Sequence, residues 1–399
     1  HEYNGQPIAP LDEEAARRFA GDVQANGCGA VALSAAFSPA VTDHELRAAE
    51  ILAEELGSDF PVSLSHEVGS LGLLERENAT ILNAALLSVA KGVTDGFRAA
   101  LAERNLQVDA YITQNDGTLM TAEEAARFPV LTLGSGPTNS MRGACALAQV
   151  SDALVVDVGG TSTDVGILVD GFPRESSAAV EVGGVRTNFR MPDLISMGLG
   201  GGTIVRGTGG DVSVGPDSVG YVVVTEALCM GGGTLTLSDI SLAGGRLDDF
   251  GDPNLVAEVD SDTVTAALEW VDDQLAVMAD RIKSARADMP LLAVGGGAHL
   301  IPDEIPGVSE IHRPENYQVA NAYGAAIAEA SGAVDKVYSY DASSREECLD
   351  EARELASNVA IRAGADPEQV RITSVTEIPM TYVPGGGCRV MVKAAGPLA

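Results

Sequence analysis

The sequence predicts an α/β protein with two lobes, and three observations lead to this prediction. The chain has 399 residues, of which 45% are hydrophobic, so it is long enough to form two cores. Residues 1–150 alternate between helical and strand patterns, which is typical of a mostly parallel sheet covered by helices. From Asp152 glycine becomes dense and hairpins replace helices. We therefore assign 1–150 to a first lobe of βαβ type, 151–336 to a second lobe, and 337–399 to a C-terminal helix and β segment.

The elements of the first lobe follow from apolar spacing and from helix boundary signals. "LDEEAARRFAGDVQANG" repeats apolar residues at helical spacing, and "GAVALSAAF" follows as a buried strand. "TDHELRAAEILAEELG" predicts a helix that opens with a capping box, Thr42 to Glu45, and ends at Gly57. A strand "PVSLS", a long helix from about Leu73 to Asn105 and a strand "VDAYIT" complete the rhythm.

The later elements are predicted in the same way. The glycine-rich stretches "MGLGGGTIVRGTGGDVSVGP" and "MGGGTLTL" indicate hairpins, and "SDTVTAALEWVDDQLAVMADRIKSARA" indicates an amphipathic helix. The strand "PLLAVGGG" and two helices, around "PDEIPGV" and "NYQVANAYGAAIAEASG", follow. The C-terminal segment contains the helix "REECLDEARELASNVAIRAG" and the strands "RITSVTEIPMTYV" and "CRVMVKAA", joined by "PGGG".

The composition argues against nucleic acid and anionic membranes as partners. The chain has 57 Asp and Glu against 25 Lys and Arg, a formal net charge of -32, and its basic residues are scattered. This acidic, arginine-biased usage fits a salt-rich cytoplasm or a GC-rich genome, and we favour the second. Five separated cysteines without a CxxC pair indicate reduced thiols. Without a signal peptide or a membrane-length apolar run, we expect a cytoplasmic protein. The start at His1 suggests a processed or truncated product.

The stretch "VVDVGGTSTDVGILVDG", residues 155–171, has the pattern of a phosphate-binding turn. An apolar strand leads into tandem glycines, whose backbone N–H groups an anion can approach, and neighbouring hydroxyls add donors. Flanking carboxylates would repel a bare phosphate, so they indicate a cation, Mg²⁺ held through water. The alternative is a tight hairpin that needs glycine only for its geometry. The residues concerned are Asp157, Gly159, Gly160, Thr161, Ser162, Thr163 and Asp164.

A second glycine turn occurs in "PLLAVGGGAHLI", where a strand runs into Gly295, Gly296 and Gly297 before a helix. Such a turn lets a flat ring or a ribose approach the backbone, and a helix N-terminus favours phosphate. Turns of this kind are common in α/β proteins, so the order of the two glycine motifs carries more information than either alone.

Weaker candidates lie elsewhere in the chain. His44, His66, His299 and His312 are not paired at metal-ligand spacing, so structural histidines are favoured over ligands. His66 follows a strand and is retained as a cleft residue. Ser135 in "GSGP" lacks the G-x-S-x-G elbow, which favours a turn cap or a phosphate or substrate donor over a nucleophile. Arg76, between two glutamates, fits an exposed charge cluster at a helix start.

The ordered set of motifs resembles the second lobe of the actin-like ATPase and sugar-kinase superfamily, and more closely the hydantoinase/oxoprolinase family. "DVGGTSTDVGIL" is similar to that family's central glycine motif, and "LGSGPTNSMRGACALA" to its Ser-Gly-Pro turn. "HELRAAEIL", "ERENATILNAAL" and "LGGGTIV…VSVGPDSVGY" match its other motifs. The resemblance extends from about Pro10 to Gly332.

The resemblance implies a two-lobed actin-like ATPase (ribonuclease H-like) fold whose first lobe is incomplete. The family's first lobe begins with its own glycine hairpin, and residues 1–150 do not supply it. The Ser-Gly-Pro turn is followed by Thr138, Asn139 and Ser140 rather than by small residues. The stretch expected after "SVGPDSVGY" is replaced by "VVVTEALCMGGGTLTLSDI".

The resemblance also implies ATP-assisted hydrolysis of a cyclic amide or imide such as a hydantoin, oxoproline or lactam, or carboxylation of a ketone. ATP would phosphorylate the substrate oxygen, with phosphates held by 159–163, Mg²⁺ positioned by Asp157, and Asp164 across the turn as a second catalytic carboxylate. Gly201, Gly202 and 295–297 would bind the rest of the nucleotide. Substrate contacts would come from Ser135, Gly136, His66 and Arg76.

Other activities and partners stay open at this point. The chain could be a small-molecule kinase of the same superfamily or a non-catalytic nucleotide-binding subunit, and some relatives act without ATP through a metal. The resemblance suggests assembly with a second enzyme subunit, or a homo-oligomer. The identity of the small-molecule substrate does not follow from the sequence.

Overall fold

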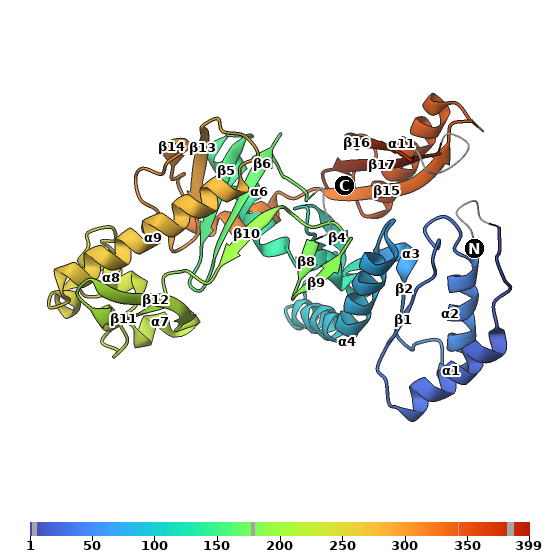
Figure 1. Cartoon of the computed structure of the whole chain (residues 1–399), viewed down its shortest axis with the longest axis horizontal. Helices are drawn as coiled ribbons and strands as arrows, with labels where there is room; N and C mark the ends of the chain where they lie inside the picture. Colours follow the sequence, from blue (N-terminus) through green and yellow to red (C-terminus); the bar gives the residue numbers. More distant parts are fainter. Residues whose placement is uncertain (2–5, 177–179, 342, 381–386) are drawn as a thin grey trace. The chain divides into compact units, whose positions relative to one another are not determined.

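The computed structural model describes residues 1, 6–176, 180–341, 343–380 and 387–399. They form two compact units (Figure 1). Unit 1 comprises His1–Gly134, Ser176–Met191 and Ala328–Ala399, and unit 2 comprises Ser135–Glu175 and Pro192–Ile327. These boundaries differ from the predicted ones because the C-terminal strands pair with a strand from the first third of the chain instead of forming a separate segment.

Unit 1 begins with helices and short strands in the predicted order. They are α1 (Glu13–Ala25), β1 (Val31–Leu33), α2 (Asp43–Leu56), β2 (Val62–Leu64), α3 (Ser65–Val68) and α4 (Leu73–Glu103). α1 begins where the Asp12 side chain accepts a hydrogen bond from the Ala15 N–H, which satisfies one of the free donors at a helix start. β1 and β2 pair in parallel, and Val23 and Leu52 pack with Val31 in a small core.

The predicted capping box at the start of α2 is wrong. Thr42 is the N-cap residue, but its side chain makes no capping hydrogen bond. Glu45 is buried instead, and its carboxylate accepts hydrogen bonds from the Ser65 hydroxyl at 2.5 Å and from the Ala35 N–H at 2.9 Å. Water can solvate the free N–H groups of an exposed helix start, whereas a buried carboxylate needs donors from the protein.

A mixed sheet in the order β16-β17-β15-β4-β3 forms the other part of unit 1. Its strands are β3 (Tyr111–Thr113), β4 (Leu119–Thr121), β15 (Ala330–Ser339), β16 (Arg371–Pro379) and β17 (Gly387–Gly396), and α11 (Arg345–Arg362) packs along β15 and β17 (Figure 1). β3 and β4 are antiparallel, so the mostly parallel sheet predicted for 1–150 is limited to β1 and β2. The predicted "PGGG" turn lies almost wholly outside the described residues.

Shorter elements complete unit 1. They are α5 (Ala122–Arg127) and the hairpin of β8 (Val180–Val182) and β9 (Val185–Thr187). The hairpin contacts α4, and the Asn78 side chain on that helix donates a hydrogen bond to the Arg186 carbonyl at 2.9 Å. This contact explains why residues 180–187 belong to unit 1, although their neighbours in sequence belong to unit 2.

Unit 2 is built on a sheet in the order β10-β6-β5-β13-β14, with β7 (Phe172–Pro173) beside β6. The strands are β5 (Ala153–Val158), β6 (Thr163–Val169), β10 (Leu194–Met197), β13 (Met289–Val294) and β14 (Val308–His312). β5 pairs antiparallel with β6 and parallel with β13. Leu154 and Val156 face the core under α9 (Ser261–Ile282), while Val155 faces the core under α6 (Ser135–Ala148) (Figure 1). This alternation is the strand period of two, and it buries both faces of the sheet.

The remaining elements of unit 2 are β11 (Thr203–Thr208), β12 (Asp211–Ser218), α7 (Val223–Glu226), α8 (Leu237–Ala243) and α10 (Ala320–Ala326). β11 and β12 form the predicted glycine-rich hairpin. α6 and α10 pack backbone to backbone, because a Cβ atom at Gly143 would collide with the Ala320 carbonyl and one at Gly324 with the Asn139 carbonyl. The helix predicted for "NYQVANAYGAAIAEASG" is shorter than expected, because the chain enters β15 at Ala330.

The helix predicted around "PDEIPGV" is wrong. Residues 302–307 form bends and turns, and only Ala298–Leu300 just before them forms a short 3₁₀ helix. Pro302 and Pro306 explain this result, since proline disrupts a helix interior and restricts the preceding residue. In the described part of the chain, no helix is long and apolar enough to cross a membrane.

Candidate functional site

The predicted phosphate turn joins β5 and β6 in an antiparallel hairpin, and the sequence prediction of this hairpin is confirmed. The Gly159 N–H donates to the Ser162 carbonyl at 2.8 Å and closes the turn. Within the described part of the chain, Gly160, Thr161 and Ser162 donate no backbone hydrogen bond in the turn, so their N–H groups are available to an anion. Thr163 is buried, and its hydroxyl donates to the Leu199 carbonyl at 2.7 Å. Thr163 therefore holds the next glycine segment in place.

Asp157 and Asp164 lie directly opposite each other across the hairpin. Burial raises the pKa of Asp157, and the Asp164 charge raises it further, while a hydrogen bond from Ser140 acts in the opposite direction. Burial also raises the pKa of Asp164, against a hydrogen bond from Ser196. Two carboxylates in facing positions repel each other, and a divalent cation between them or near them would relieve this repulsion.

Three glycine segments meet at this hairpin. The Gly201 N–H donates to the Gly159 carbonyl at 3.0 Å and the Gly202 N–H to the Gly160 carbonyl at 2.7 Å, so these N–H groups brace the turn and are not free for phosphate. In the turn after β13, the Gly297 N–H donates to the Val158 carbonyl at 2.7 Å. A Cβ atom at Gly297 would lie 2.7 Å from the Val158 side chain, which explains the need for glycine there.

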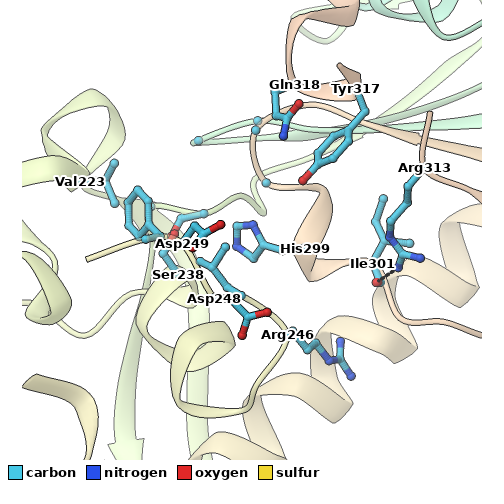
Figure 2. Close-up of a pocket in the computed structure, with 18 of the residues that line it drawn as sticks. Val223, Ser238, Arg246, Asp248, Asp249, His299, Ile301, Arg313, Tyr317 and Gln318 are labelled. Carbon is cyan, nitrogen blue, oxygen red and sulfur yellow. Dashed lines mark hydrogen bonds between the residues drawn. The ribbon is translucent and has the colours of Figure 1, made fainter. Parts of the chain in front are cut away.

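A cavity of about 930 Å³ opens beside the three glycine segments, all within unit 2 (Figure 2). Its volume is in the range of small-molecule and cofactor sites. Six of the predicted nucleotide-binding residues line it, namely Gly159, Gly160, Gly201, Gly202, Gly296 and Gly297. The predicted residues that do not line it are Asp157, Thr161, Ser162, Thr163, Asp164 and Gly295, which lie on the hairpin or pack directly behind it.

The sequence analysis did not predict the loop "GGRLDDF", whose residues Arg246, Asp248, Asp249 and Phe250 line the cavity. The loop has no secondary-structure period or phosphate motif, and only its run of charges could have drawn notice. The Arg246 guanidinium forms a bidentate pair with Asp272, with both N–O distances at 2.7 Å. Arg246 is thus engaged by the protein.

The other charged and aromatic lining residues follow β13. Arg313 donates to the Ile301 carbonyl at 2.7 Å and pairs with Asp303. His299, treated in the sequence as a weak metal candidate, lines the cavity together with Tyr317 (Figure 2). Both arginines are therefore committed to protein partners, while Asp248 and Asp249 are exposed acceptors.

The predicted substrate residues Ser135 and Gly136 lie at the start of α6 and do not line this cavity. The Ser135 carbonyl accepts a hydrogen bond from the Thr138 hydroxyl at 3.0 Å. The Gly136 carbonyl accepts one from the Asn321 side chain at 2.8 Å. The Ser-Gly-Pro turn therefore begins a helix, and the substrate role of its residues stays a prediction.

Arg76 is buried with 1% of its surface exposed, so its prediction as part of an exposed cluster is wrong. Its guanidinium donates to the carbonyls of Ala35, Ala36 and Ser70 and to the Ser65 hydroxyl, at 2.5 to 3.1 Å. These four hydrogen bonds use donors that a carboxylate substrate would need. Burial lowers the pKa of Arg76, and the nearby Glu45 charge opposes this effect.

His66 belongs to the same cluster in unit 1, which we call the Glu45 cluster and define as Glu45, Ser65, His66 and Arg76. The His66 Nδ1 lies 2.7 Å from a carboxylate oxygen of Glu45. Burial favours the protonated form of Glu45, but hydrogen bonds from His66, Ser65 and Ser38 outweigh it and hold the pKa of Glu45 at about 2. The cluster is a network of hydrogen bonds within unit 1, and the role of His66 as a cleft residue stays a prediction.

The other histidines have local partners. His312 lies 3.0 Å from Glu310 on the same strand. Among the described residues, the one group whose geometry could hold a metal ion is His1, Asp43 and His44. His299 therefore stands apart from any such group.

The glycine hairpin and the lined cavity form a candidate small-molecule site in an α/β protein. The family model described as Hydantoinase/oxoprolinase matches residues 76–290, and the model described as Hydantoinase/oxoprolinase N-terminal region matches residues 1–56. The chain belongs to the hydantoinase/oxoprolinase family, which confirms the resemblance found in the sequence.

The chain is similar to named proteins and to solved structures. The gamma subunit of acetophenone carboxylase from Aromatoleum aromaticum is 27% identical over 256 residues, which is 61% of this chain and 35% of the relative. A nucleotide-free structure of acetone carboxylase, from work on ATP-dependent acetone carboxylation, matches with a TM-score of 0.69 and 20% identity, over 100% of this chain and 68% of that chain. The ATP-dependent caprolactamase from Pseudomonas jessenii matches with a TM-score of 0.78 and 19% identity, over 99% and 69%.

The matches concern the fold and only part of the relatives' length. The solved structures share the mixed α/β fold of this chain. The chain spans just over a third of the length of the curated relatives that it matches.

Proposed function

We propose that unit 2 binds ATP and that the chain is the nucleotide-binding part of an ATP-dependent enzyme acting on a cyclic amide or a ketone. The observation that carries this proposal is the meeting of three glycine segments at one cavity, beside a hairpin on which two half-buried carboxylates, Asp157 and Asp164, face each other. The order of these motifs also supports the predicted two-lobed, actin-like arrangement. The hairpin and the turn after β13 lie side by side, because the Gly297 N–H donates a hydrogen bond to the Val158 carbonyl.

In this proposal the tip of the β5–β6 hairpin binds the phosphates. Among the described residues, the backbone N–H groups of Gly160, Thr161 and Ser162 donate no backbone hydrogen bond in the turn, and a phosphate would supply an acceptor for them. Asp157 and Asp164 fit Mg²⁺ held through water, because hard oxygen ligands suit that ion and a bound cation would oppose the burial that raises the pKa of each carboxyl. When bound, Mg²⁺ would neutralise charge on the phosphates during transfer.

Two reactions share this chemistry, and the comparisons support both. In ATP-dependent lactam hydrolysis and in ketone carboxylation, a phosphoryl group on the substrate oxygen would create a leaving group. The caprolactamase supports the first reaction, and the carboxylases support the second. A relative that is a gamma subunit supports assembly with a second enzyme subunit. A kinase and a non-catalytic nucleotide-binding subunit stay as rival proposals.

Nucleotide binding is tested by titrating the chain with ATP and Mg²⁺ and following its thermal unfolding. A ligand that binds the folded state alone stabilises it by about 2.7 kcal/mol at 100 times its Kd. We expect a saturable rise in Tm with ATP and Mg²⁺. No rise at millimolar ATP would overturn the proposal.

The reaction is tested by measuring phosphate release with caprolactam, hydantoin, 5-oxoproline, and acetone with bicarbonate. Release that depends on one of these substrates supports the enzyme, and its bicarbonate dependence separates carboxylation from hydrolysis. A stable phosphorylated substrate would favour the kinase instead. ATP binding without any substrate-dependent turnover would favour the non-catalytic subunit.

A further inference from the structure

His299 lies on the wall of the cavity, on the short 3₁₀ helix Ala298–Leu300 that follows the glycine turn. Figure 2 shows its ring among the lining residues, with Asp248 and Asp249 on one side and Tyr317 and Gln318 on the other. Neither the phosphate turn nor the carboxylate pair involves it. A polar ring at this place needs a separate explanation.

The two ring nitrogens of His299 have different surroundings. Nε2 is buried and has no hydrogen-bond partner in the part of the chain that the structure describes. The other nitrogen, Nδ1, is therefore the one that meets the Gly296 backbone, whose hydrogen bond acts to raise the pKa of the ring. A backbone group that favours the protonated ring is a carbonyl acceptor, so Nδ1 carries the hydrogen. Nε2 is left as a bare acceptor on a ring that lines the cavity.

Burial also keeps this ring neutral. Desolvation outweighs the Gly296 hydrogen bond and lowers the pKa of His299 to about 4, so the ring carries no charge at neutral pH. A buried acceptor without a donor is unfavourable, and such groups in folded proteins are usually satisfied by water or a ligand. The cavity is the place from which that donor would come.

The chemistry of the wall restricts what the donor is. A phosphate oxygen is an acceptor and would be repelled by the Nε2 lone pair. A metal ion would need further ligands, and His299 belongs to no group of metal-ligating side chains among the described residues. Arg246 and Arg313, which could attract phosphate, are held by Asp272 and by backbone carbonyls. This part of the cavity therefore suits the uncharged, donor-bearing part of a ligand.

We propose that Nε2 of His299 accepts a hydrogen bond from the nucleoside of the bound nucleotide and so determines which nucleotide the site takes. The inference rests on the proposed nucleotide function and deepens it. Two donors share this chemistry, the exocyclic amino group of adenine and a ribose hydroxyl. Guanine carries an acceptor oxygen where adenine carries its amino group, so the same contact disfavours guanine nucleotides if the base is the partner.

The test measures Kd values for the whole chain with Mg²⁺ at neutral pH by calorimetry. The ligands are ATP, purine riboside triphosphate, which lacks the amino group, and the 2′-deoxy and 3′-deoxy forms of ATP. In the unaltered chain we expect one analogue to bind about tenfold more weakly than ATP, since an unmade hydrogen bond of this kind is worth about that factor. The identity of that analogue tells whether the base or the ribose is the donor.

Variants then assign the effect to His299. We expect His299→Ala to weaken ATP binding about tenfold and to bind ATP and the discriminating analogue equally, as a double-mutant cycle requires for a direct contact. His299→Gln, whose amide oxygen can accept, should restore part of the preference. The matched control is His312→Ala on β14, which does not line the cavity and should keep both affinity and preference. Unfolding curves without ligand check that each variant is folded.

The outcomes separate the two proposals. If the unaltered chain does not bind ATP, the proposed function fails and this inference fails with it. If ATP binds but His299→Ala, folded as the control is, still prefers ATP to the analogue, only the role of His299 is overturned. Equal weakening of ATP and all analogues by His299→Ala would likewise overturn it, because a loss without selectivity indicates a packing effect.

Discussion

The cavity of unit 2 and the Glu45 cluster of unit 1 are both rich in polar groups, yet they treat these groups in opposite ways. In the Glu45 cluster, Arg76 makes four hydrogen bonds to protein atoms, and its neighbours hold the pKa of Glu45 at about 2. In unit 2, Asp157 and Asp164 have raised pKa values, and Nε2 of His299 lacks a partner among the described residues. The difference teaches that a buried charge whose neighbours satisfy it supports the fold, whereas carboxyls with raised pKa values and an unpartnered ring nitrogen near one cavity mark a candidate ligand site.

The largest effect on stability is expected for Arg76→Ala. This change removes four hydrogen bonds and leaves the buried Glu45 carboxylate without the nearby positive charge. Breaking a buried, charged network by removing one partner costs about 3–5 kcal/mol. Chemical denaturation should show this loss in the free energy of unfolding. Glu77→Ala, on the exposed side of the same helix, is the control and should change it by less than about 0.5 kcal/mol. An equally small effect of Arg76→Ala would show that the cluster is not structural.

A smaller effect is expected for the pH dependence of the Glu45 cluster. The pKa of Glu45 is lowered in the folded protein to about 2 from the ordinary value of 4.5. Its ionised form therefore stabilises the fold above the unfolded pKa, and this contribution is lost as the pH falls through the interval from about 4.5 to 2. Allowing for solvent screening, we expect about 2 kcal/mol from this group. Unfolding curves of Glu45→Gln at pH 5, 4 and 3 should lose less stability on acidification than the unaltered chain. Parallel curves would contradict the assignment.

The smallest effect on stability is expected for Asp157→Asn, and here the comparison is sharpest. Burial raises the pKa of this carboxyl, so its neutral form is favoured in the folded protein and that contribution is lost as the pH rises through the folded pKa. A neutral Asn should therefore leave the free energy of unfolding at pH 7 within about 0.5 kcal/mol of the unaltered value, or raise it. Stabilisation by ATP and Mg²⁺ should be lost.

Asp273→Asn on the exposed face of α9 is the matched control for this change. It should keep both the stability and the response to ATP and Mg²⁺. A large loss of stability in Asp157→Asn, comparable to that in Arg76→Ala, would mean that both regions are structural and that the contrast between them is not functional.

Much of the fold is predictable from local sequence because its elements carry their own signals. α1, α4, α9 and α11 follow apolar spacing and boundary residues, and β5, β6 and β13 follow short apolar runs next to glycine. The predictions that were wrong concern features that depend on contacts between residues far apart in the sequence. Glu45 leaves its expected cap because Ser65 and Ala35 offer buried donors, and β15 pairs with β4 across some 200 residues of chain.

The sequence predicted those parts of the candidate site that are formed by glycine turns. Gly159, Gly296 and Gly297 line the cavity as expected, because a glycine between a strand and a turn carries a backbone requirement that is visible in sequence. The sequence placed Arg76 on the surface because its hydrogen-bond acceptors are several to many residues away along the chain, and most of them are backbone carbonyls. No sequence pattern reveals such partners. The role of His299 depends on a hydrogen-bond partner and on burial, and both exist only after folding.

The backbone contact between α6 and α10 has a mechanical consequence. α6 begins at Ser135, where the chain passes from unit 1 into unit 2, and α10 ends at Ala326, just before it returns. No side chain separates the two helices at Gly143 and Gly324, so a larger residue at either position would force apart the helix that leads into unit 2 and the helix that leads out of it.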